Sequence, residues 1–205
     1  GQKVYVETCP QYLLLDESVY YNPDYSQAAR YVCAPPIREK ANQEALWRGL
    51  RRGEIQTIST DHCSFTLAQK DAGRDDFTKI PGGLPGVETR GELVYSYGVA
   101  AKKISLAQMC RVLSENPARL YGLYPRKGVL APGSDADIVI YDPGDSHVIR
   151  AEDCIANVDY NPYEGFVTAG GIREVWLRGR KTVEGGRVLD TVPAGMYLAR
   201  GKCSL

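Results

Sequence analysis

Two segments rich in β-branched residues flank a helical pattern near the start of the chain. KVYVET forms residues 3–8, and EIQTIST forms residues 54–60. Between them, QEALWRGLRR has the composition of a helix, with Gly53 directly after it and Asn42 directly before it as a candidate cap. A strand, a helix and a second strand in this order predict two parallel strands in one sheet. The beginning of the chain therefore predicts an α/β fold.

Two more helices are predicted later in this part of the chain. Ser105 and Gln108 match the capping box that begins a helix over SLAQMCRVLSE. Asn116 and Pro117 predict the end of that helix and the start of another, which Gly122 would close. These signals describe local structure and carry no information about chemistry.

The pattern changes near residue 125. Short β-rich runs follow, separated by turn residues, and Gly185-Gly186 is typical of a two-residue hairpin turn. We therefore predict an α/β domain over residues 1–125 and a small antiparallel β unit over residues 126–205. The strands expected in the second part cover residues 136–141, 146–150, 172–178 and 181–189.

The composition limits the binding partners and the cellular compartment that we expect for this chain. The 25 basic and 25 acidic residues balance, so no basic surface points to nucleic acid. No apolar run approaches the roughly 18 residues of a membrane span. The six cysteines are scattered without a C-x-x-C pair. We therefore expect a cytoplasmic protein with reduced thiols that binds neither nucleic acid nor membrane.

One aspartate, Asp61, stands directly after the second predicted strand, in STDHCSF at residues 59–65. In β/α barrels catalytic groups project from this end of the strands, but an aspartate there can also cap the next loop. On an extended chain His62 would point to the opposite face, which favours a packing role. His147 lies in the β unit, where a structural role is expected. The residues alone leave both interpretations of Asp61 open.

Two loops are candidates for contact with a ligand. The glycine-rich segment GGLPG, residues 82–86, lacks the lysine and the hydroxyl residue of a phosphate-binding loop, so it is either a loop close to some other ligand or a plain turn. The segment YYNPDYSQAARYVCAPPIR, residues 20–38, is too long for a turn, and loops of this length are often functional.

Several phrases, in order along nearly the whole chain, resemble dihydropyrimidinase and D-hydantoinase, cyclic-amide hydrolases of the metal-dependent amidohydrolase superfamily. They are ETCPQYL (7–13), YVCAPPIREK (31–40), STDHCSF (59–65), DDFTKIPGGLPGVETR (75–90), ENPARLYGLYPRKGVLAPGSDADIVIYDP (115–143) and NVDYNPYEG (157–165).

The resemblance implies an α/β fold: the C-terminal part of a TIM-type (β/α) barrel followed by part of a small β-sandwich domain. It also implies a binuclear zinc centre that hydrolyses dihydropyrimidines or hydantoins, small cyclic amides, to N-carbamoyl amino acids. By the family pattern, Asp61 is a metal ligand and the catalytic general base. Main-chain groups around Ala34 and Gly82, where the family often has Ser and Asn, would contact the ring amide of the substrate.

The chain has too few histidines for this metal centre. The family needs an H-x-H pair, two further histidines and a carboxylated lysine, whereas this chain has two histidines, neither at a matching position. We therefore expect a C-terminal portion of such an enzyme, inactive alone, whose open strand edges favour a homo-oligomer. The alternatives are a non-catalytic scaffold of the collapsin-response type, which lacks the aspartate present here as Asp61, and an allantoinase or dihydroorotase relative.

Overall fold

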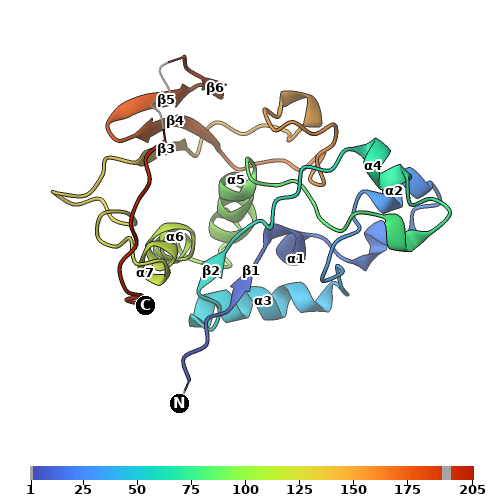
Figure 1. Cartoon of the computed structure of the whole chain (residues 1–205), viewed down its shortest axis with the longest axis horizontal. Coiled ribbons are helices and arrows are strands. Elements are labelled where there is room, and N and C mark those ends of the chain that lie inside the picture. Colours follow the sequence, from blue (N-terminus) through green and yellow to red (C-terminus); the bar gives the residue numbers. More distant parts are fainter. Residues whose placement is uncertain (1, 191–194) are drawn as a thin grey trace.

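The computed structural model describes residues 2–190 and 195–205. Strand β1 (Glu7–Thr8) pairs in parallel with strand β2 (Thr57–Ile58), which confirms the predicted pairing, although both strands are shorter than the sequence predicts. Figure 1 shows these two strands in the middle of the molecule, with helix α3 (Ala41–Arg52) beneath them. The strand–helix–strand order of the sequence therefore forms a layer of helix α3 packed against the strand pair.

A buried apolar cluster joins α3 to the strand pair. Trp47 of α3 is 0 % exposed, and its indole nitrogen donates to Leu13 O at 3.2 Å. Leu13 belongs to the short helix α1 (Pro10–Leu14), so this contact fixes the segment that follows β1 on the helix layer. The buried side chains of the cluster are Leu13, Trp47, Leu50, Ile55, Ile58, Val94, Ile104 and Val112.

Helix α3 ends where the sequence predicts but begins earlier. Gly53 closes it in the left-handed conformation, with φ 72°. Asn42, predicted as the cap, lies inside the helix: its N–H donates to Glu39 O at 3.0 Å and its side-chain amide to the same oxygen at 3.1 Å. Because the first turn already starts at Glu39, Lys40 occupies the cap position, and the prediction for Asn42 is wrong.

Helix α6 (Leu106–Cys110) begins with the predicted capping box, since Ser105 and Gln108 bond to each other's main-chain N–H. The predicted break at Asn116-Pro117 is wrong. The helix continues through a π-helical segment, Arg111–Glu115, into α7 (Asn116–Leu120). The wider π turn lies just before the proline, which lacks the N–H that a regular α-helix would use. Asn116 is buried and donates to Gln56 O at 2.7 Å instead of capping a new helix.

Replacing Ser105 by alanine is expected to destabilise the chain by about 1 kcal/mol, because the N–H of Gln108 loses its acceptor. Urea denaturation measures this change. The matched control is Ser114→Ala on the same continuous helix, since Ser114 is exposed and should tolerate alanine within about 0.5 kcal/mol. Equal effects of the two substitutions would contradict a capping role for Ser105.

The second part of the chain forms an antiparallel sheet, as predicted, and its strands have the order β3-β4-β5-β6. Gly185 and Gly186, with φ 55° and 75°, make the predicted turn between the last two strands. The strand expected at residues 146–150 is wrong: Val148 forms one isolated bridge to Val167 and does not join this sheet. The strands are β3 (Ile138–Asp142), β4 (Gly171–Leu177), β5 (Arg180–Glu184) and β6 (Arg187–Val188).

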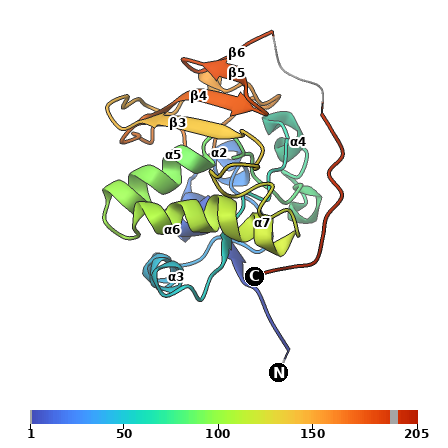
Figure 2. The ribbon, with the colours of Figure 1, turned by 90° about the vertical axis from the view of Figure 1, so that its left-hand side faces the viewer.

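This sheet packs on the helix α5 (Arg90–Val94), which continues as a π-helical segment, Tyr95–Ala100. The Glu92 carboxylate accepts a hydrogen bond from Ile172 N at 3.1 Å, and Ser96 Oγ accepts one from Ala169 N at 2.8 Å. Figure 2 shows the sheet over α5, with α3 on the opposite side of the molecule. These two bonds tie residues 169–172 to α5 and its π-helical continuation.

The other helical elements are short, and among the described residues no helix has the length and apolar character of a membrane span. They interrupt segments that the sequence presents as loops. They are the 3₁₀ turns Glu17–Tyr21, Phe77–Lys79 and Ala151–Asp153, and the helices α2 (Tyr25–Ala29) and α4 (Leu67–Asp71).

Candidate active site

Asp61 lies three residues beyond the end of β2, on a backbone that is not extended. Its φ is 49°, in the left-handed region that few residues other than glycine, asparagine and aspartate adopt. The chain therefore turns at Asp61, and the expected alternation of Asp61 and His62 across an extended strand is wrong. The Asp61 side chain is exposed. Such backbone strain in a non-glycine residue is common at functional sites.

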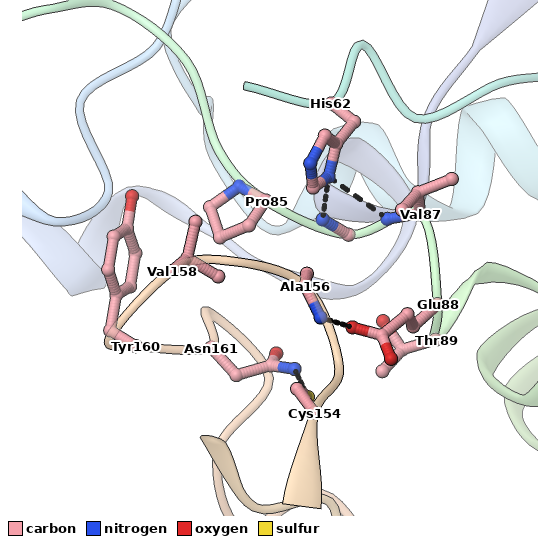
Figure 3. Close-up of a pocket in the computed structure, with 11 residues that line it drawn as sticks. His62, Pro85, Val87, Glu88, Thr89, Cys154, Ala156, Val158, Tyr160 and Asn161 are labelled. Carbon is pink, nitrogen blue, oxygen red and sulfur yellow. Dashed lines mark hydrogen bonds between the residues drawn. The ribbon is translucent and has the colours of Figure 1, made fainter. Parts of the chain in front are cut away.

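His62 holds the glycine-rich loop in place. Its Nδ1 accepts hydrogen bonds from Gly86 N at 3.1 Å and Val87 N at 3.3 Å, which Figure 3 shows as dashed lines. This agrees with the packing role expected for it. His147 also has structural partners: Nε2 lies 3.4 Å from a Glu92 oxygen, and Nδ1 lies 3.2 Å from Thr168 Oγ1.

The structure brings the two predicted substrate-contact positions together. A methyl group built on Gly82 would lie 3.8 Å from Ala34 N and 3.9 Å from Ala34 Cβ. Gly83 N donates to Val32 O at 3.0 Å, which ties the two segments to each other. Cys63 N donates to the next residue of the loop, Leu84 O, at 2.9 Å, so the chain just after Asp61 joins the same assembly. Both Ala34 and Gly82 are exposed.

A residue that the sequence did not single out supports this assembly from below. Lys70 on α4 is 0 % exposed. Its Nζ donates to Val32 O at 2.7 Å, Pro81 O at 2.6 Å and Gly83 O at 2.8 Å. Burial lowers the pKa of Lys70 to about 8. A lysine in a short polar segment is usually exposed, so no sequence signal marks it as buried.

Two side chains that lose protons only at high pH lie near Asp61. Burial raises the pKa of the Cys9 thiol, and the negative charge of Asp61 adds to the shift. Burial also raises the pKa of Tyr12, again with a smaller contribution from Asp61. The Tyr12 hydroxyl donates to Pro35 O at 3.0 Å, beside Ala34. Both groups are therefore neutral neighbours of the carboxylate.

Neither of two hollows in the described part of the chain is lined by Asp61, Ala34 or Gly82. The pocket in Figure 3 measures about 10 Å³, whereas ligand pockets usually measure about 300–1,000 Å³. Glu88 closes it by accepting hydrogen bonds from Ile155 N at 2.8 Å and Ala156 N at 2.7 Å. A second hollow, which is open and measures about 350 Å³, is lined by Arg51, Val99, Lys102, Lys103, Ile104, Ser105 and Gln108.

A pair of zinc ions does not fit the described residues by themselves. Zinc is usually held by three or four His, Cys, Asp or Glu side chains. Within residues 2–190 and 195–205, no group of three or more such side chains could hold a metal ion. Asp61 could supply one ligand, and further ligands would have to come from outside these residues.

Comparison with known proteins identifies the family to which this fold and site belong. The model of the amidohydrolase family matches residues 11–182 of this chain. The chain therefore belongs to the amidohydrolase family. Within this family, its similarity is to D-hydantoinases and dihydropyrimidinases.

Two relatives illustrate this similarity in sequence. The chain is 45 % identical over 204 residues to the D-hydantoinase of Streptomyces coelicolor, covering 99 % of this chain and 43 % of that protein. It is 44 % identical over 203 residues to the D-hydantoinase of Geobacillus stearothermophilus, covering 98 % and 43 %. The chain thus spans less than half the length of these curated relatives.

Solved structures show the same similarity as the sequence comparisons. The dihydropyrimidinase of Brevibacillus agri superimposes with a TM-score of 0.89 at 46 % identity, covering 91 % of this chain and 40 % of that one. The L-hydantoinase of Arthrobacter aurescens gives a TM-score of 0.84 at 33 % identity, covering 92 % and 41 %. The α/β architecture of this chain is therefore that of part of a hydantoinase.

Proposed function

We propose that this chain is the C-terminal part of a zinc-dependent hydrolase of cyclic amides, which opens dihydropyrimidines or hydantoins to N-carbamoyl amino acids. The observation that carries the proposal is the arrangement around Asp61. The carboxylate stands on a strained turn after β2, and the exposed segments at Ala34 and Gly82 lie side by side in the same assembly. The names of the relatives at 44–45 % identity support the same chemistry.

The proposed roles follow from the chemistry of ring opening. Hydrolysis breaks the bond between the ring carbonyl carbon and the ring nitrogen, and adds a water oxygen to that carbon. Asp61 would accept a proton from the attacking water and deliver it to the departing nitrogen, as a general base and then a general acid. Main-chain groups near Ala34 and Gly82 would orient the ring amide.

In this proposal the remaining parts of the site come from the rest of the enzyme. Since the described residues do not fit a zinc pair alone, Asp61 would be a single ligand beside others outside them. The residues around β1 and β2 would belong to a (β/α) barrel, and residues 126–205 to a small β-sandwich domain.

The test joins this chain to the segment of the Geobacillus relative that precedes its matched region. We call this protein the hybrid. With added zinc, we expect the hybrid to hydrolyse hydantoin or dihydrouracil and the isolated chain to hydrolyse neither. A folded, zinc-loaded hybrid without activity would contradict the proposed function. Turnover by the isolated chain would contradict the need for outside ligands.

The same assay separates the alternatives. Allantoin and dihydroorotate are offered beside hydantoin, and preference for either one would assign the chain to an allantoinase or dihydroorotase instead. The retention of Asp61 favours an enzyme over a collapsin-response scaffold, since those scaffolds lack this carboxylate.

We also propose that the isolated chain self-associates, because β1 and β2 keep unpaired edges. In the described part of the chain, β1 and β2 form a sheet of two strands with no further strand. Val4 and Val6, just before β1, are 73 % and 45 % exposed. Light scattering after size-exclusion chromatography should give a mass above the 22.6 kDa of one chain. A monomer with a cooperative melt would contradict this expectation.

A further inference from the structure

Lys70 is buried beneath the two segments that we propose contact the substrate. Its three hydrogen bonds, to Val32 O, Pro81 O and Gly83 O, use the three donors of an ammonium group. The neighbouring groups that influence its pKa are the thiols of Cys33 and Cys63, with no carboxylate among them. A buried cation bonded to main-chain carbonyls alone costs free energy, so its location calls for a role beyond packing.

The planarity of the peptide group links these carbonyls to the opposite side of the loop. In a trans peptide the C=O and the following N–H point in opposite directions. The described cis bonds are at Pro35 and Pro125, so the peptides after Val32 and Pro81 are trans. When Lys70 draws the C=O groups of these two residues inward, the N–H groups of the next residues, Cys33 and Gly82, turn away from it.

These two N–H groups are available to a ligand. Neither the Cys33 nor the Gly82 N–H donates to another group within the described residues. The neighbouring Ala34 and Gly82 are exposed, whereas Lys70 is fully buried. The donors therefore lie on the accessible side of the assembly, and the lysine lies on the closed side.

We propose that Lys70 is a positioning residue that aims the main-chain N–H groups of Cys33 and Gly82 at the carbonyl oxygens of the cyclic amide. This inference rests on the proposed function. Lys70 holds segment 32–34 and segment 81–83 in one fixed arrangement through three bonds of 2.6 to 2.8 Å. Without the ammonium group, the carbonyl oxygens of Pro81 and Gly83 would lose this donor and Val32 O would keep only the N–H of Gly83, so the two segments would separate or turn.

The first experiment follows amide hydrogen exchange in the isolated chain, with and without hydantoin. In the unchanged chain, hydantoin should slow exchange at Cys33 and Gly82. In Lys70→Met, which keeps the length of the side chain but cannot donate, this protection should vanish. The amide of Gly83, which donates to Val32 O, should then exchange at least about tenfold faster.

Two variants control for the fold. Lys79→Met makes the same substitution at an exposed lysine of the neighbouring segment and should leave the protection by hydantoin intact. Lys70→Gln keeps two side-chain donors and should retain part of the protection if Lys70→Met fails to fold. Protection by hydantoin that is equal in Lys70→Met and in the unchanged chain would overturn the inference. Absence of protection at both amides in the unchanged chain would overturn it as well.

The second experiment uses the hybrid to separate positioning from simple structural support. Lys70→Met should raise KM for hydantoin at least about tenfold and keep kcat within about threefold, because the N–H groups bind ground state and transition state alike. A lysine that served only the fold would reduce the amount of active enzyme and leave KM unchanged, and that result would overturn the inference. An unsubstituted hybrid without activity would instead contradict the proposed function, and the exchange experiment then decides the role of Lys70.

Discussion

Replacing Asp61 by asparagine is expected to lower kcat of the hybrid for hydantoin by at least about 10³-fold. Asparagine has the same shape as aspartate but takes up no proton, so the attacking water would lose its base and the departing nitrogen its acid. The loss corresponds to about 4 kcal/mol of transition-state stabilisation. Steady-state kinetics at saturating zinc measures it.

This substitution is expected to change the rate of catalysis and to leave the stability of the fold almost unchanged. Asp61 adopts φ 49°, a conformation that asparagine tolerates as readily as aspartate, and its side chain is exposed. The free energy of unfolding should therefore change by less than about 0.5 kcal/mol. The matched control is Asp75→Asn, which removes the same charge from an exposed loop position and should keep full activity. If Asp61→Asn kept more than about a tenth of kcat, the carboxylate would not be the base.

The sequence predicted those elements whose signals are local. The capping box at Ser105 and the turn at Gly185-Gly186 follow from a few neighbouring residues, and the parallel pair β1-β2 follows from the order of locally predicted strands and helix. The sequence failed at Asn116-Pro117, where a π-helical segment and a hydrogen bond to Gln56 O keep one helix continuous. That bond joins residues far apart in the chain, and local patterns carry no such information.

The candidate site likewise has features that were predicted from the sequence and features that were not. Asp61, Ala34 and Gly82 were selected by resemblance, and their catalytic and binding roles remain predictions. The Ala34 and Gly82 segments share the bonds of Lys70, whose burial arises because two loops meet over helix α4. The left-handed turn at Asp61 was not predicted either, because many residues can follow a strand without such a turn.

The largest effect on stability is expected at Gly83, between the two segments. A methyl group there would lie 2.4 Å from Cys63 Sγ and 2.6 Å from Cys63 Cβ, far inside contact distance. In addition, φ at Gly83 is 148°, which side chains rarely adopt. Gly83→Ala should therefore destabilise the isolated chain by about 3–5 kcal/mol, combining overpacking with backbone strain.

Urea denaturation measures this loss of stability. Two further variants separate the contribution of the steric clash from that of the backbone strain. The matched control Gly82→Ala places its methyl group no closer than 3.8 Å to a neighbour, so it should cost less than about 1 kcal/mol. Adding Cys63→Gly to Gly83→Ala removes both clashing atoms and should restore the steric share, whereas the strain at φ 148° persists. If Gly83→Ala were no more harmful than Gly82→Ala, the close approach of this loop to Cys63, and with it the arrangement that places Gly82 beside Ala34, would be wrong.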